Sequence, residues 1–164
     1  MNTIDYLRMN LDMGDMTLDL IDDMKDAPMT APTAKGGNHP LWVLGHLAYA
    51  EASMVYEMML GEPNPLEDWK PIFADGTEPT SDASDYPSYA EVRARFDEVR
   101  AHTLKVLDAL TDADLDKKSQ NYPEEWAAYF DTYGKVLAIV GSHTFIHHGQ
   151  VADARRMAGR KPTM

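Results

Sequence analysis

The sequence predicts an all-α fold, an antiparallel four-helix bundle with a long connection between helices 2 and 3. Apolar residues recur at the three- and four-residue spacing of an amphipathic helix in four separate stretches. No stretch shows the alternation of apolar and polar residues that marks a half-buried strand. Segments rich in Pro and Gly separate the periodic stretches. The chain of 164 residues has the length of one domain, so we expect residues 1–164 to form a single bundle.

The first helix is expected over about residues 3–26, and it carries two apolar patches. The main face has helical spacing and consists of Ile4, Leu7, Leu11, Leu18 and Ile21. Gly14 interrupts this helix, because a glycine inside a helix costs about 1 kcal/mol relative to alanine. Met9, Met13 and Met16 lie away from the main face. Methionines adapt to irregular surfaces, so this second patch either fills gaps in the monomer core or forms a homodimer interface.

The second helix is expected over about residues 40–60. Pro40 suits the first turn of a helix, and Gly61 suits the position just after its end. Residues 62–85 then lack periodicity and are rich in Pro, yet they contain Trp69 and Phe73. We expect this connection to form a lid or a compact loop that crosses one end of the bundle.

The third helix is expected over about residues 87–110 and the fourth over about residues 132–158, ending before Gly159. The apolar stripe of the fourth helix includes two histidines and consists of Val136, Val140, His143, His147, Val151 and Ala154. A short turn begins at Thr111, where the sequence Thr-Asp-Ala-Asp resembles a capping box.

Composition excludes several classes of function. The formal net charge of −12 repels phosphate backbones, and no stripe of Lys and Arg offsets it, so we expect no nucleic-acid partner. No apolar run approaches the ~18–20 residues that cross a bilayer, so we expect no membrane partner. The first residues do not resemble a signal peptide, and the sequence contains no cysteine; both observations favour a cytoplasmic protein.

Two histidines of the fourth helix indicate a metal site. His143 and His147 are four residues apart, so their rings leave the same helix face about one turn apart. They continue the apolar stripe, where an unpaired polar group costs about 1–3 kcal/mol. One divalent cation would satisfy both rings. Hydrogen bonds from each ring to a Tyr, an Asp or a carbonyl group are the alternative that the sequence leaves open.

His46 on the second helix favours the metal interpretation, because it supplies a third imidazole from an element that can face the fourth helix. We interpret His39 and His102 as structural or solvent-facing. No carboxylate has a comparable position: Glu57 is too far along the second helix, and Glu51 is rotated away from His46. The expected site is therefore His46, His143 and His147, with positions open to water or a ligand.

Two motifs carry a resemblance to a known family. These are Trp42-Val43-Leu44-Gly45-His46-Leu47 and His143-Thr144-Phe145-Ile146-His147-His148-Gly149-Gln150. In their order and helix placement, the chain resembles the DinB-like family of four-helix metalloproteins, which includes thiol-dependent transferases. The resemblance implies one divalent ion, often nickel or zinc, held by His46, His143 and His147. The family commonly has Arg where this chain has His148, a difference that bears on any anion or thiol chemistry carried over from the family.

The sequence leaves two functions open. The first is a metal-dependent transferase or hydrolase that acts on a small molecule; its catalytic residues are unknown. Because the chain lacks cysteine, any sulfur nucleophile would be a low-molecular-weight thiol cosubstrate. Trp69, Phe73, Trp126 and Tyr129 either wall the substrate pocket or seal the end of the bundle. The second function is a non-catalytic metal-stabilised bundle or small-ligand-binding protein, which the lack of an evident general base beside the histidines favours.

Overall fold

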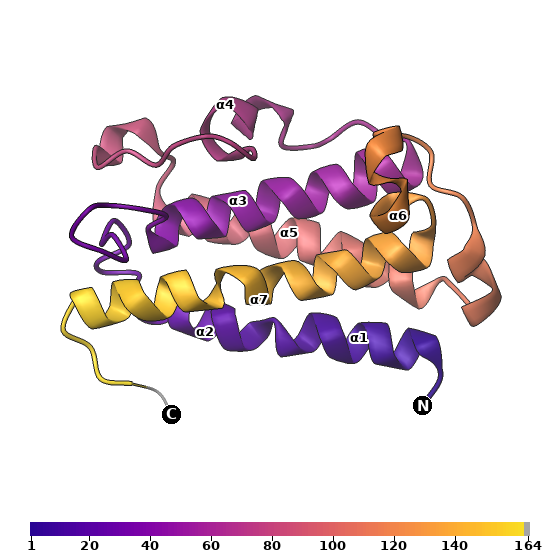
Figure 1. Cartoon of the computed structure of the whole chain (residues 1–164), viewed down its shortest axis with the longest axis horizontal. Coiled ribbons are helices and arrows are strands. Elements are labelled where there is room, and N and C mark those ends of the chain that lie inside the picture. Colours follow the sequence, from indigo (N-terminus) through magenta and orange to yellow (C-terminus); the bar gives the residue numbers. More distant parts are fainter. Residues whose placement is uncertain (163–164) are drawn as a thin grey trace.

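Helices built from the periodic stretches account for the core of the computed structural model, which describes residues 1–162 (Figure 1). The longer helical elements are α1 (Thr3–Met13), α2 (Asp15–Asp23), α3 (Pro40–Ala52), the π-helix η1 (Ser53–Leu60), α5 (Tyr89–Asp108) and α7 (Tyr133–Met157). The short ones are η2 (Glu67–Trp69), α4 (Lys70–Phe73), η3 (Ala83–Asp85), η4 (Asp112–Asp116), η5 (Glu124–Trp126) and α6 (Ala127–Phe130). Residues 1–162 contain no β-strand, only isolated bridges, which confirms the all-α prediction.

Local signals set the helix ends. The side chain of Asn2 accepts a hydrogen bond from the backbone N–H of Asp5 at 2.8 Å and caps α1. Ser88 caps α5 in the same way, through a 3.2 Å bond from the backbone N–H of Glu91. Gly61 ends η1 with a φ of 70°, a left-handed conformation that favours glycine. The predicted helix ends therefore fall close to the observed ones, except that Gly14 divides the first helix into α1 and α2.

Two neighbouring pairs of helices run parallel. Thr17 in α2 lies 2.9 Å from His148 in α7, and Asp23, further along α2, bonds at 2.9 Å to Arg155, further along α7. These contacts fix a common direction for α2 and α7. Asn10 in α1 bonds to Ala138 in α7 at 3.3 Å, so α1 follows the same course.

The pair α3 and α5 is parallel as well. The buried apolar residues form two clusters. The first apolar cluster includes Val92, near the start of α5, and Leu41, near the start of α3. The second apolar cluster includes Leu107 and Met59, near the ends of α5 and η1. The expected alternation of directions is therefore wrong for these neighbours.

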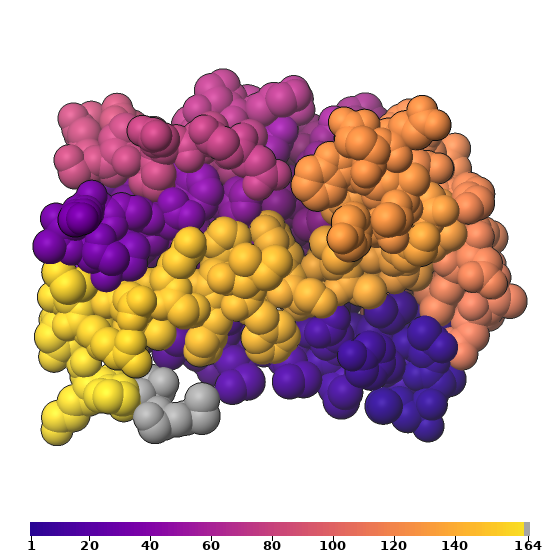
Figure 2. Space-filling model, in the orientation of Figure 1, coloured from indigo at the N-terminus to yellow at the C-terminus, as the bar shows by residue number. Residues whose placement is uncertain are grey.

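The connection between the second and third long helices explains this difference. It was expected to cross one end of the bundle, but it runs back along α3 through η2, α4 and η3 (Figures 1 and 2). The chain thereby returns to the end at which α3 begins, and α5 starts there. Trp69 and Phe73 are buried in the first apolar cluster and bind this connection to the core.

Glycines allow α7 to approach the first helices closely. A Cβ atom at Gly141 would lie 2.4 Å from Nδ2 of Asn10, and one at Gly14 would lie 3.2 Å from Oγ1 of Thr144. Small residues at these contacts bring α1, α2 and α7 together along their length. None of the helices within residues 1–162 is long and apolar enough to cross a membrane.

Candidate metal centre

The structure brings the three predicted histidines together in the middle of the fold. His46 projects from α3, and His143 and His147 project from one face of α7. Nε2 of His143 lies 3.3 Å from Nε2 of His46 and 3.3 Å from Nε2 of His147. One ligand atom from each ring lies within 4.8 Å of the other two, which is close enough for all three to contact one ion.

A backbone carbonyl fixes the ring of His46. Nδ1 of His46 lies 2.8 Å from the carbonyl oxygen of Phe73. A carbonyl oxygen only accepts, so Nδ1 carries the hydrogen and Nε2 keeps a free lone pair. The packing that creates this contact depends on Gly45, because a Cβ atom there would lie 2.2 Å from the Phe73 ring. Trp42 stacks on a face of the His46 ring, with ring centroids 4.7 Å apart and planes 7° from parallel.

The ring of His147 is oriented by a side-chain amide. Its Nδ1 donates to Oε1 of Gln150 at 2.9 Å, and Nδ2 of Asn38 donates to the same oxygen at 3.3 Å. Nε2 of His147 therefore also presents its lone pair to the other histidines. For His143, no protein group within residues 1–162 accepts a hydrogen bond from Nδ1, so protein groups orient two of the three rings.

Burial favours the neutral form of the histidines. Desolvation, followed by repulsion from charge on His46 and His147, lowers the pKa of His143 to about 3. Desolvation also lowers the pKa of His147, although its bond to Gln150 acts in the opposite direction. Both rings are therefore neutral near pH 7, which is the form that binds a metal.

The remaining histidines lie outside this group. His148 follows His147 directly and so points about 100° away from it on α7, and its Nδ1 lies 2.9 Å from Oγ1 of Thr17. Nδ1 of His39 accepts from the backbone N–H of Trp42 at 3.1 Å and caps α3, while its Nε2 donates to the carbonyl of Thr80 at 3.2 Å. His102 stacks on Tyr56 with ring centroids 4.1 Å apart.

A carboxylate that the sequence did not indicate lies beside the three histidines. Oδ1 of Asp75 is 3.7 Å from Nε2 of His46, and the Asp75 side chain is 94% exposed. The expectation that no carboxylate lies near the site is therefore wrong. Asp75 lies between α4 and η3, in the connection that runs along α3. No periodic pattern there assigns a residue to a face, so the sequence did not indicate that Asp75 lies near the histidines. Glu51 does point away from the histidines, and it pairs with Arg100 at 2.8 Å.

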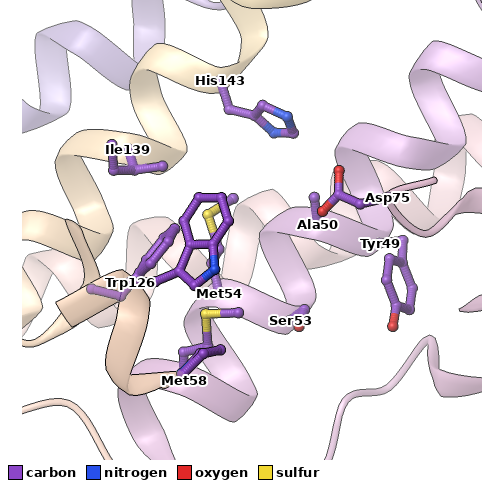
Figure 3. Close-up of a pocket in the computed structure, with 11 residues that line it drawn as sticks. Tyr49, Ala50, Ser53, Met54, Met58, Asp75, Trp126, Ile139 and His143 are labelled. Carbon is purple, nitrogen blue, oxygen red and sulfur yellow. The ribbon is translucent and has the colours of Figure 1, made fainter. Parts of the chain in front are cut away.

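A cavity of about 340 Å³ opens next to His143 (Figure 3). Its walls come from α3, η1, α7, the segment around η5 and α6, and the connection just after α4. The lining residues are Tyr49, Ala50, Ser53, Met54, Met58, Asp75, Pro123, Trp126, Phe130, Ile139 and His143. Trp126 thus lines a pocket, as one interpretation of the sequence expected. Trp69 and Phe73 belong instead to the core, and Tyr129 does not line this cavity.

Comparison with known proteins places the chain in a family. No curated protein matches the sequence significantly. The model of the DinB superfamily matches residues 11–151, a span that includes the three histidines, the crossing connection and most of the described helices. The chain belongs to the DinB superfamily.

Proposed function

We propose that His46, His143 and His147 bind one divalent metal ion, zinc or nickel. The spacing of the ring nitrogens is the observation that carries this proposal. Two imidazole nitrogens bound ~2.0–2.1 Å from a tetrahedral ion lie ~3.3–3.4 Å apart, and Nε2 of His143 is 3.3 Å from Nε2 of each neighbouring histidine. A hydrogen on Nε2 of His143 can bridge to one of these nitrogens at a time, whereas one cation satisfies the lone pairs of all three rings. Imidazole ligands without thiolates suit zinc and nickel.

We propose further that the site serves a metal-dependent transferase or hydrolase. When bound, an ion with three protein ligands would supply Lewis-acid activation of a water or a low-molecular-weight thiol. Phe73 and Gln150 hold two of the histidine rings in their binding tautomer. The apolar walls next to His143 can hold a small substrate and exclude water from it. This cavity favours a site that takes a small molecule over a metal that only cross-links helices. A small-ligand-binding protein without turnover is the second candidate function, and a turnover assay separates it from the enzyme.

Metal content in matched histidine variants tests the ligand assignment. We expect about one equivalent of zinc or nickel per chain in protein purified without an affinity tag, and loss of most of it in His143→Ala and His147→Ala. His148→Ala is the control, because the His148 ring is also on α7 but contacts Thr17 of α2 and lies outside the site. Retention of metal by His147→Ala, or loss in His148→Ala alone, would contradict the assignment. Turnover of electrophiles by the loaded protein, with and without common small thiols, then tests the reaction class.

We also propose a four-helix bundle that assembles as a homodimer. The four members of the bundle are α1 together with α2, α3 together with η1, α5, and α7. The connection between the second and third members runs along the length of the bundle.

Exposed apolar side chains on α1 and at the start of α2 support the dimer: Tyr6 is 50%, Met9 41%, Met13 45% and Met16 42% exposed. Light scattering should give twice the monomer mass, and Met13→Glu should lower it. A monomeric mass for the unmodified protein at high concentration would remove this proposal.

A further inference from the structure

The cavity beside His143 is apolar over most of its wall. Methionine, aromatic and aliphatic side chains form most of the wall, and Figure 3 places Met58 at the opposite end from His143. Trp126 is 52% exposed although it is a large apolar residue, and its ring stands at the cavity, in contact with the Phe130 ring at 6.2 Å between centroids. Exposed apolar surface of this kind, in a concave site, marks the place where an apolar ligand packs.

The charge around the cavity has one sign. Asp75 is the only acidic side chain in its lining, and neither Lys nor Arg belongs to that lining. An adjoining hollow shares Ser53 and Met58 with the cavity and adds Glu57 and Glu62, again without a cationic residue in its lining. Among the protein's own side chains, a ligand with a carboxylate or phosphate group would therefore meet negative charge and no cationic partner, so only the proposed metal ion could attract it.

We propose that this cavity binds a small apolar molecule with a neutral or positively charged polar group, and that Asp75 discriminates against anionic ligands. The apolar body lies between Met54, Met58 and Trp126, and the polar group lies at the end formed by Asp75 and His143. The volume of about 340 Å³ is at the lower end of the range for small-molecule sites, which fits a body of one aromatic ring with a short chain. This inference rests on the proposed function only where it concerns the reaction of the bound molecule. Binding of the ligand's apolar body does not need the metal.

Three probes with a common body test the proposal: 2-phenylethanol, 2-phenylethylamine and phenylacetate. Their dissociation constants are measured by ligand-observed NMR with the metal-loaded protein and with His147→Ala, in which the ion cannot attract an anion. In His147→Ala, we expect the alcohol and the amine to bind and phenylacetate to bind at least about fivefold more weakly. In Asp75→Asn combined with His147→Ala, the gap between phenylacetate and the alcohol should close.

Matched aromatic variants locate the binding surface. Trp126→Ala should weaken binding of the alcohol by about tenfold, because a large apolar contact is lost. Tyr129→Ala is the control, since Tyr129 is 55% exposed on the same segment and does not line the cavity. The proposal is overturned if no probe binds, if phenylacetate binds His147→Ala as well as the alcohol does, or if the two aromatic variants behave alike. If the unmodified protein binds the probes but takes up no metal, the proposed function is contradicted and this inference stands.

Discussion

Burial of His143 links its protonation to the stability of the metal-free protein. Its pKa is about 3 in the folded state, against an ordinary value of 6.5. Between these values the unfolded chain binds a proton that the folded chain does not, so the free energy of unfolding falls as the pH decreases through this window. We expect urea denaturation of the metal-free protein to show a loss between pH 7 and pH 4.5 that exceeds the loss in His143→Gln by about 1–2 kcal/mol. An equal pH dependence in the two proteins would show that His143 is not held neutral by the fold.

Gly45 controls the orientation of His46 through Phe73. A methyl group in Gly45→Ala would lie 2.2 Å from the Phe73 ring, so the ring and its carbonyl must move away from His46. We expect a loss of about 1–3 kcal/mol in the free energy of unfolding and a metal affinity about 10–100-fold weaker. Denaturation and metal titration measure the two effects.

Gly149 provides the matched control for this substitution. It also lies inside a helix, α7, but a Cβ atom there meets nothing within 4 Å. Gly149→Ala should therefore stabilise the protein by about 0.5–1 kcal/mol and leave metal binding unchanged. Unchanged metal affinity in Gly45→Ala would show that the Phe73 carbonyl does not position His46.

At the level of single residues, helical phase predicted that His143 and His147 share one face of α7, because this helix is regular and its apolar stripe is clear. The same reasoning placed His46 on a facing helix. Asp75 could not be found in this way, since it lies where the chain has no repeating pattern and reaches His46 only through the path of the crossing connection.

At the level of elements, a buried ion pair joins three helices. Arg100 in α5 bonds to Glu51 in α3 at 2.8 Å and to the carbonyl of Leu11 in α1 at 3.2 Å. The side chains are 11% and 4% exposed, so removing one charge leaves the other buried without a partner. Glu51→Gln should therefore lower the free energy of unfolding by about 3 kcal/mol in a denaturant titration.

An exposed pair on the same helix serves as the comparison. Arg95 and Glu98 form a 2.6 Å ion pair with exposures of 38% and 63%, so Glu98→Gln should cost less than about 0.5 kcal/mol. Similar costs for Glu51→Gln and Glu98→Gln would mean that burial does not govern the energetics of the Arg100 pair.

The helices themselves could be predicted better than their directions. Capping residues such as Ser88 and ending residues such as Gly61 act within a few positions of the helix end that they set. The direction of α5 depends instead on where residues 62–88 lead the chain. Buried Trp69 and Phe73 hold that segment along α3, and only three-dimensional packing reveals this.

For the whole molecule, we expect metal removal to preserve the fold. Two apolar clusters extend through both halves of the structure and do not depend on the three histidines. Chelation should leave the far-ultraviolet circular dichroism unchanged and lower the melting temperature. The free energy of unfolding should fall by about 2.7 kcal/mol relative to protein in which the free ion is at 100 times its dissociation constant. Collapse of the helical signal on chelation would show that the ion is part of the folding core.

The separation of His46 and His143 in the sequence has a consequence for the newly made chain. The two rings meet across 97 residues, which a ribosome adds in roughly 5–20 s. During this interval α3 can pack with α5, because both precede α7, yet His46 has neither of its histidine partners. In the proposed metal site, capture of the ion would therefore follow the docking of α7, and only a chain whose helices have all been made could hold it.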